Sequence, residues 1–511
     1  MATLAEAFAG VLVPLIAGIV ASFCIEQLLQ PRPLLQARSL KAIAMHIAIW
    51  LLFFGFGLAI WQRPHFASGL NTAGMLLLVL VSNAKFASLR EPFLLSDFRF
   101  FIALLRHPRL YLPFFGALPA IGCAIVFIAF CGFALWMEPS LMSKVGLAAF
   151  LYCCLIVVGF GAALLWFAMR DPTPIALAPS RDVQTFGLLG SFLRYWQEER
   201  ANEPIVMIAN LRGALQGRAK NANPPKLPHI VAVQCESFFD ARRVFPDVNP
   251  DVLRNFDALT RIASRAGRLN VPAWGANTVR TEFSFLTGIA PASLGIHQFN
   301  PYRKFARVGM PSIASELKKR GYRTLCIHPF AATFYDRNKV FPMLGFDEFI
   351  DVSAFAPEDK SGPYMGDLAV AAKVRTMLSV ATDPLFIFVI TMENHGPLHQ
   401  EQVADGDIER LYASNPPAGY EEFTIYLRHL QHTDAMLGQL YEALNATTRR
   451  GWLCAYGDHV PILPGVYAAN DFVDGRTDYM VVGPDRASIA SHSLDIEPEN
   501  LSACLLREAG L

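Results

Sequence analysis

The chain has 511 residues, of which 53% are hydrophobic and only 17% are charged, a composition too apolar for an ordinary soluble protein. Its formal net charge of +1 gives no sign of a nucleic-acid partner, so DNA- and RNA-binding functions are not expected. The nine cysteines show no metal-type C-x-x-C spacing. Composition therefore favours a membrane protein and disfavours a cysteine-based metal site.

The apolar excess lies in the first third of the chain. Five stretches there are long enough to cross about 30 Å of hydrocarbon as helices. They are residues 8–29, 42–62, 68–84, 111–136 and 146–169. The first has neither the basic start nor the small-residue cleavage site of a signal peptide, so it is expected to be retained. Residues 1–169 are therefore predicted to form a transmembrane domain of five helices.

Two segments of mixed composition interrupt or follow these spans. Residues 85–110 combine basic side chains with Phe and Leu in an apolar run too short to span, which predicts an interfacial helix. Residues 170–227 hold an amphipathic run between two proline-containing stretches, which is typical of a linker with helices in it.

A different pattern begins at residue 228 and continues to residue 511. Four buried-type strands, IVAVQ, TLCIH, LFIFVIT and WLCAYGD, are separated by helical or loop segments, which predicts an α/β domain around a largely parallel sheet. Ligands of such sheets bind just beyond the carboxyl ends of the strands. Polar side chains stand at all four of these ends: Glu236, His328, Glu393 with His395, and Asp458 with His459.

Three of these side chains form a candidate metal site. Asp458 and His459 follow one buried strand directly, and Glu236 ends the first strand of the same domain. Taken alone, the Asp-His pair could be a polar turn and Glu236 a capping carboxylate. Together they offer two carboxylates and one imidazole, a set that suits Mn²⁺, Mg²⁺ or Zn²⁺.

A candidate nucleophile lies in the stretch WGANTVRTEFSFLTG. A Gly-Ala-Asn turn there delivers Thr278 to the predicted start of a helix. A helix N-terminus favours developing negative charge, and a bound divalent ion lowers the pKa of a coordinated hydroxyl, so Thr278 could act as an alkoxide. A simple N-cap is the alternative role for Thr278, and Thr281 is a competing nucleophile.

The chain carries a series of ordered motifs, which are ESFFD, GANTVRTEF, FYDRNKVFPMLGFDEF, MENHGP and YGDH. In these motifs and in its multi-span layout, the chain resembles the lipoteichoic acid synthase and glucan phosphoglycerol transferase family. This family belongs to the sulfatase and alkaline phosphatase superfamily, and the resemblance covers residues 229–490. It implies a sulfatase-like catalytic domain that holds one divalent metal ion, with Mn²⁺ preferred over Mg²⁺ or Zn²⁺. The ligands carried over are Glu236, Thr278, Asp458 and His459.

The same resemblance implies a set of substrate-binding residues. Arg337 and His395 would contact the phosphate or glycerol of the substrate, and His328 would be a further contact. Tyr335 stands where relatives often carry tryptophan, so an aromatic wall is kept. A guanidinium offers phosphate a planar fork of donors, although a surface ion pair for Arg337 and a buried structural role for His328 are alternatives.

The implied reaction is a two-step transfer in which Thr278 takes glycerol phosphate from phosphatidylglycerol and an acceptor hydroxyl then displaces it. The acceptor would be an envelope glycan or polymer, and the enzyme would lie in the bacterial inner membrane with its catalytic domain outside the cytoplasm. A phosphoethanolamine transferase of the same superfamily is an alternative, as is a non-catalytic envelope-polymer sensor or scaffold. The sulfatase signature C/S-x-P-x-R is absent around Thr278.

The distribution of basic residues opposes this orientation. The connections at residues 30–41 and 85–110 hold eight Lys and Arg residues, against Arg63 and Lys144 in the other two. By the positive-inside rule, five spans would then leave the catalytic domain in the cytoplasm. The resemblance requires the opposite side, so either the spans are miscounted by one or the rule fails here, and a miscount is expected.

Overall fold

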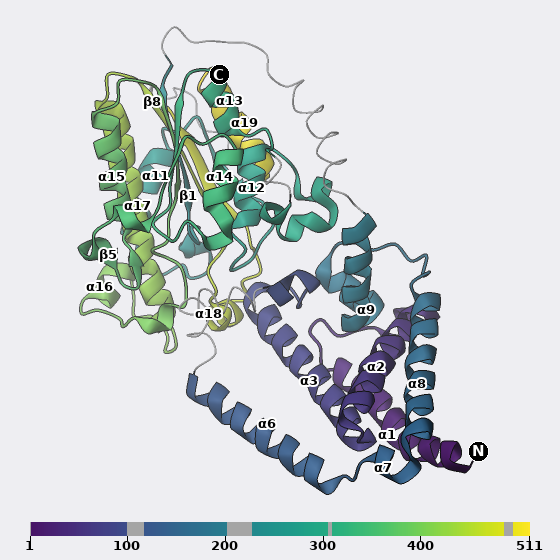
Figure 1. Ribbon diagram of the computed structural model, residues 1–511. Coiled ribbons are helices and arrows are strands. Elements are labelled where there is room, and N and C mark those ends of the chain that lie inside the picture. The colour runs from purple at the N-terminus through teal and green to yellow at the C-terminus, as the bar shows by residue number, and fades with distance from the viewer. Residues whose placement is uncertain (1, 100–116, 202–226, 305–308, 485–493) are drawn as a thin grey trace. The chain divides into compact units, whose positions relative to one another are not determined.

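The computed structural model describes residues 2–99, 117–201, 227–304, 309–484 and 494–511 (Figure 1). The chain divides into two compact units, Met1–Ala201 and Asn202–Leu511. The predicted linker at residues 170–227 is thus shared, because its described residues up to Ala201 belong to the first unit.

In its described residues the first unit contains helices and no strands. Five of its helices are long and apolar enough to cross a membrane, as predicted. The helices of this unit are α1 (Ala2–Glu26), α2 (Leu40–Trp61), α3 (Pro64–Leu89), α6 (Ala117–Met137), α7 (Leu141–Val145), α8 (Leu147–Ala168) and α9 (Pro179–Ala201). Many large apolar side chains on the long helices are exposed, which suits a surrounding of lipid rather than water.

The predicted interfacial helix at residues 85–110 is wrong in its described part. Lys85 belongs to the end of α3, where its ammonium group bonds to the carboxylates of Glu91 at 2.7 Å and Asp97 at 2.5 Å. These ion pairs fold the chain back against α3, and only Leu95–Arg99 forms a short 3-10 helix. Residues 100–110 lie outside the described residues.

Two contacts show which connections share one end of the helices. The Ser39 hydroxyl donates to the Asp171 carboxylate at 2.5 Å, and the Lys41 ammonium donates to the main-chain carbonyl of Arg170 at 2.8 Å. The basic connection at residues 30–41 therefore lies at the end where the chain leaves α8. In the described residues no sixth spanning helix is found, so the expected miscount gains no support there.

The second unit is built on a seven-stranded sheet of order β2-β9-β8-β1-β7-β3-β4. Its strands are β1 (His229–Cys235), β2 (Arg265–Leu269), β3 (Arg323–Ile327), β4 (Glu348–Ile350), β7 (Leu385–Ile390), β8 (Gly451–Gly457) and β9 (Thr477–Val482). The four predicted strands are β1, β3, β7 and β8, which lie side by side and parallel. The sheet is mixed because β9 pairs antiparallel with both β8 and β2.

Helices cover both faces of this sheet (Figure 1). On one face lie α11 (Arg254–Thr260), α15 (Asp367–Ser379) and α17 (Glu421–Ala446), and on the other α12 (Val279–Thr287), α13 (Ile313–Lys319), α14 (Arg337–Met343) and α19 (Pro498–Glu508). The strand β1 is buried throughout, and its side chains alternate between the two cores. The smaller elements are α16 (Asp407–Leu411), α18 (Pro464–Ala469) and the hairpin β5 (Lys360–Ser361) and β6 (Tyr364–Met365).

Gly457, the last residue of β8, touches the loop that follows β1. A Cβ atom at this position would lie 1.8 Å from the carbonyl oxygen of Phe238, a backbone atom that cannot move aside cheaply. Gly457→Ala is therefore expected to lower the free energy of unfolding by about 3 kcal/mol or more. Thermal unfolding of the purified protein in detergent measures this. Gly465→Ala on α18 is the control, because no atom lies within 4 Å of its Cβ position; equal effects of both substitutions would contradict the prediction.

Candidate active site

The parallel pairing of β1 and β8 brings the predicted metal ligands together. Cys235 at the end of β1 pairs in register with Gly457 at the end of β8. The next residues of the two strands are Glu236 and Asp458, so both leave the sheet at the same level of its carboxyl edge. The following His459 completes the group.

The side chains of Glu236, Asp458 and His459 form a buried cluster. One ligand atom from each lies within 4.8 Å of the others. The His459 Nε2 atom is 3.4 Å from Asp458 Oδ2 and 3.5 Å from Glu236 Oε1. Burial and the neighbouring Asp458 carboxylate raise the pKa of Glu236 to about 8, since two carboxylates here lack enough compensating positive charge.

The hydrogen bonds of this cluster leave ligand atoms open. Asp458 Oδ1 accepts from the backbone N–H groups of Ser237 and His459, both at 2.9 Å, while the buried Oδ2 has no hydrogen-bond partner among the described residues. The His459 ring is 3.1 Å from the carbonyl of Val460 through Nδ1. A carbonyl only accepts, so Nδ1 donates and the lone pair of Nε2 is left for a cation. The cluster fits a divalent metal ion.

The backbone that carries Glu236 is fixed on each side. Its N–H donates to the Thr391 hydroxyl at 2.9 Å, at the end of the neighbouring β7. Ser237 has a left-handed φ of 56°, and its carbonyl accepts from the Tyr426 hydroxyl at 2.8 Å. The turn after β1 is therefore held by the strand beside it and by α17.

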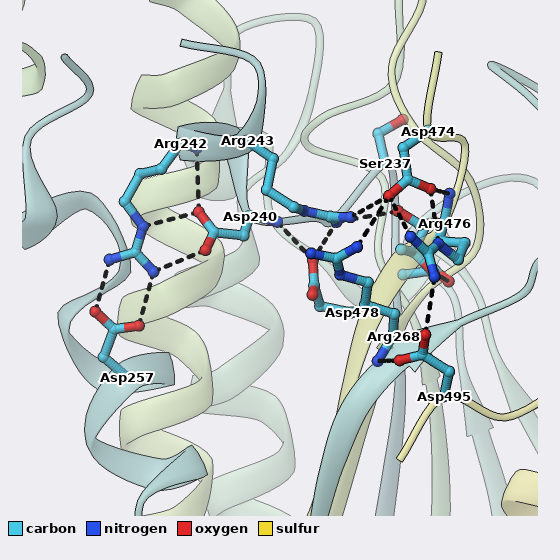
Figure 2. Close-up of polar contacts among 12 residues, drawn as sticks. Ser237, Asp240, Arg242, Arg243, Asp257, Arg268, Asp474, Arg476, Asp478 and Asp495 are labelled. Atoms are coloured by element: carbon cyan, nitrogen blue, oxygen red, sulfur yellow. Dashed lines mark hydrogen bonds and ion pairs between the residues drawn. The ribbon is translucent and has the colours of Figure 1, made fainter. Parts of the chain in front are cut away.

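An ion-pair network holds the far end of the same turn (Figure 2). The Asp478 carboxylate accepts from the backbone N–H of Asp240 at 2.7 Å and from the guanidinium of Arg243 at 2.6 Å. Arg242 bridges the carboxylates of Asp240 and Asp257. Outer pairs extend the network through Arg268, Asp474, Arg476 and Asp495. Such coupling makes the ESFFD turn a rigid support rather than a free loop.

The predicted turn before Thr278 is confirmed by the backbone. Gly275 and Asn277 have left-handed φ angles of 68° and 69°, and α12 begins at Val279. Thr278 is the residue before the helix, is half-buried, and makes no side-chain capping hydrogen bond. The N-cap alternative for Thr278 is thus not supported by its side chain.

Thr281 has a different environment. It is fully buried, and its hydroxyl donates to the main-chain carbonyl of Asp458 at 2.8 Å. This bond ties the first turn of α12 to the strand end that carries two of the metal-ligand candidates. Because Thr278 precedes Thr281 by three residues, both lie on one side of the helix. The Thr281 hydroxyl is engaged within the protein.

Arg337 is buried and paired. Its Nη2 and Nε atoms donate to the two oxygens of Glu282 at 2.7 and 3.2 Å, and the ion pair outweighs burial, which alone would lower the pKa of the guanidinium. The ring of Tyr335 lies with its centroid 5.3 Å from the guanidinium carbon. The surface ion pair considered for Arg337 is therefore excluded. Sequence reasoning missed Glu282, although it follows Thr278 by one helical turn.

The two further histidines have distinct roles in the hydrogen bonding. The His328 Nδ1 atom donates to the Ile390 carbonyl at 3.2 Å, so its Nε2 atom accepts from Arg337 Nη1 at 3.2 Å. Burial and the Arg337 charge hold the pKa of His328 well below its usual range. The His395 Nδ1 atom donates to the Gly396 carbonyl at 2.7 Å, and burial lowers the pKa of His395. Among the described residues nothing bonds to His395 Nε2.

Glu393, the remaining strand-end candidate, is engaged by other residues. Its Oε1 atom bonds to the Nδ1 atom of His432 at 2.5 Å, and its Oε2 atom accepts from the backbone N–H of Asp367 at 2.7 Å. Although burial opposes it, the His432 bond lowers the pKa of Glu393. Glu393 therefore supports the start of α15 and is not one of the grouped ligands.

Comparison with known proteins agrees with this site. Residues 228–509 match the family described as Sulfatase. The chain belongs to the sulfatase family. A divalent metal is common to members of its superfamily, which fits the open ligand atoms described above.

One curated relative matches nearly the whole chain, and others match a part of it. The chain is 29% identical over 488 residues to a capsular polysaccharide biosynthesis protein of Rhizobium meliloti, covering 91% of this chain and 86% of that one. It is 27% identical to a putative cyclic beta-1,2-glucan modification protein of the same organism, covering 55% of this chain but only 46% of the relative. Lipoteichoic acid synthase 1 of Bacillus subtilis is 23% identical over 33% of this chain and 26% of its own.

Solved structures include a Streptococcus pyogenes phosphoglycerol transferase, GacH, in complex with sn-glycerol-1-phosphate. It is 24% identical, with a TM-score of 0.48, over 59% of this chain and 81% of that chain.

Asp458→Asn tests the open oxygen directly. The substitution keeps an oxygen that can accept from the two backbone N–H groups, but it removes the negative charge and an anionic ligand atom. We expect the affinity for Mn²⁺ to fall by more than about 100-fold, because loss of partners outside the ligand set already costs 10- to 100-fold. Isothermal titration calorimetry of the full-length protein measures this.

Asp434→Asn is the matched control. Asp434 is also buried, but its oxygens accept from the backbone N–H groups of Asn255 and Phe256. Equal metal affinity in wild type and Asp458→Asn would remove the cluster as the metal site.

Proposed function

We propose that this protein is a membrane-bound phosphoglycerol transferase, moving glycerol phosphate from phosphatidylglycerol to an envelope glycan or polymer. The observation that carries the proposal is the open face of the Glu236, Asp458 and His459 cluster next to the start of α12. A divalent ion, Mn²⁺ in this proposal, would be held by these residues with Thr278 and would make the threonine hydroxyl more acidic.

Thr278 is the nucleophile in the proposed reaction. Its oxygen attacks the phosphorus of phosphatidylglycerol, the bond from phosphorus to the diacylglycerol oxygen breaks, and diacylglycerol leaves with a proton. A hydroxyl of the acceptor then attacks phosphorus, the bond to the threonine oxygen breaks, and Thr278 recovers its proton. The half-buried Thr278 supports this assignment over the buried and bonded Thr281.

Arg337 and His395 serve the transferred group in this proposal. The guanidinium meets phosphate oxygens, where a planar fork of charged donors suits the anion. The open Nε2 atom of His395 accepts the proton of an attacking hydroxyl and then passes that proton to a leaving oxygen, because its lowered pKa keeps the ring neutral and able to accept near neutral pH. Tyr335 would add an aromatic wall for the substrate beside Arg337, and His328 would assist as the hydrogen-bond partner of Arg337.

The acceptor in this proposal is a polysaccharide of the bacterial envelope. One relative, which matches 91% of the chain, is a capsular polysaccharide biosynthesis protein, and another is a putative cyclic beta-1,2-glucan modification protein. The five candidate spans support a membrane-bound enzyme that meets a lipid donor at the bilayer surface. We place it in the inner membrane, with the catalytic unit outside the cytoplasm.

The nucleophile and donor are tested together. Purified protein is incubated with Mn²⁺ and phosphatidylglycerol without acceptor, and peptides are mapped by mass spectrometry. We expect a glycerol phosphate adduct on Thr278, near-complete loss of transfer in Thr278→Ala, and measurable transfer in Thr281→Ala. An adduct on Thr281 would show that Thr278 is not the nucleophile. An adduct formed only from phosphatidylethanolamine would identify a phosphoethanolamine transferase. A protein that forms neither adduct would fit the sensor alternative.

The orientation is tested by reporter fusions after Met169 and Leu511. We expect activity of a periplasm-only reporter at both positions, because the lipid donor and the glycan acceptor meet outside the cytoplasm. Since residues 30–41 lie at the same end of the helices as Arg170, the result also places that basic connection. A cytoplasm-only signal at both positions would reverse the placement and the choice of donor with it.

A further inference from the structure

Glu282 is a fully buried carboxylate one helical turn after Thr278. Its two oxygens accept from four donors. The Nε and Nη2 atoms of Arg337 donate at 3.2 and 2.7 Å, the Gln234 amide donates at 3.4 Å, and the Tyr302 hydroxyl donates as well. A buried carboxylate with this many donors is well compensated, so its position is fixed by directional bonds rather than by packing alone.

These donors come from the elements that carry the candidate site. Gln234 lies on β1 two residues before Glu236, and its amide oxygen accepts from the Tyr456 hydroxyl at 2.9 Å. Tyr456 lies on β8 two residues before Asp458. Arg337 begins α14, and Glu282 itself lies on α12. One carboxylate thus connects the nucleophile helix, both ligand strands and the arginine.

The pairing also decides which donors Arg337 can offer. A guanidinium carries five N–H bonds. Three are directed within the protein, two to Glu282 and one to the Nε2 atom of His328. One N–H bond remains on each terminal nitrogen, Nη1 and Nη2, and these two nitrogens make up the end-on edge of the guanidinium, an edge that can bind phosphate oxygens in pairs.

We propose that Glu282 is a positioning residue that, with His328, holds Arg337 so that only its end-on edge meets the phosphate of the substrate. The proposal rests on the proposed function only in taking a phosphate group as the substrate's reacting part. It goes beyond that function by assigning the orientation of the arginine to a residue that does not touch substrate.

The test uses inorganic phosphate as the probe and the full-length, Mn²⁺-loaded protein. Phosphate affinity is measured by isothermal titration calorimetry for wild type, Glu282→Gln, Arg337→Gln and the double variant. We expect each single variant to weaken phosphate binding about 10- to 100-fold, the size of a hydrogen bond to a charged group. The double variant should be no weaker than Arg337→Gln alone, because Glu282 acts through Arg337. Affinity for Mn²⁺ should stay within about twofold of wild type.

Several outcomes would overturn the proposal. Additive losses in the double variant would mean that Glu282 acts independently of Arg337, and unchanged phosphate affinity in Glu282→Gln would mean that it does not orient the arginine. A wild-type protein that binds no phosphate would remove the premise. A joint fall in metal and phosphate affinity, matched by Asp434→Asn, would show a purely structural role.

A milder variant covers the case in which Glu282→Gln does not fold. Tyr302→Phe removes one hydrogen bond to Glu282 but leaves the ion pair, and we expect phosphate binding to weaken about threefold. No change in this variant, with Glu282→Gln unfolded, would also reject the proposal. Failure of the proposed function is separate, since it is seen when wild type forms no adduct from phosphatidylglycerol while the coupling between Glu282 and Arg337 persists.

Discussion

The parallel, in-register pairing of β1 with β8 is the constraint on which the candidate site depends. It places the ends of the two strands level, so that Glu236 and Asp458 emerge side by side. A slip of one residue would displace one of them by about 3.3 Å and turn its side chain to the other face. Gly457 belongs to this arrangement, because only a residue without a Cβ leaves room for the Phe238 carbonyl. The backbone register thus fixes the relative positions of Glu236 and Asp458.

Two kinds of buried carboxylate follow from this frame. Glu282 is matched by the cation of Arg337 and is saturated with hydrogen bonds. Glu236 and Asp458 share the single imidazole of His459, and one oxygen of Asp458 has no hydrogen-bond partner among the described residues. A buried negative charge that lacks a partner is costly unless a cation or a proton arrives. Glu282 is thus a carboxylate that stabilises the site, whereas the charges of Glu236 and Asp458 suit the binding of a cation.

The strand ends were predictable from sequence, whereas the pairing behind them was not. Short apolar runs identify β1, β3, β7 and β8, and the rule that ligands lie beyond parallel strands then points to Glu236 and Asp458. The role of Glu282 could not be predicted in this way, because its partner, Arg337, lies 55 residues further along the chain. Sequence spacing carries no signal for such a contact unless the fold is known.

Two of the missed strands, β2 and β4, have a related cause. The strand β4 has only three residues and none of them is buried, while β2 carries two arginines and is only partly buried. Neither has the apolar run that identifies a central strand. The prediction of an interfacial helix at residues 85–110 was wrong for another reason. The charges of this segment were assigned to a lipid surface, but Lys85 is satisfied by two carboxylates of the same segment.

The helical unit also contains a buried ion pair, which attaches α9 to the rest of the unit. The Arg38 guanidinium lies 2.7 Å from Glu26, and the other Glu26 oxygen accepts from the backbone N–H of Leu188 at 2.8 Å. A Cβ at Gly187 would come within 2.4 Å of both charged side chains, so glycine lets α9 approach the pair.

Arg38 is therefore not a free loop charge of the kind that sets membrane orientation, but part of the attachment of α9. After α8, the described residues contain no further helix of spanning length and apolarity. The helix α9, which Glu26 holds at one end of the helices, is the last described helix of the first unit. In the proposed function, the side of the membrane that this end faces decides which lipid leaflet can supply the donor.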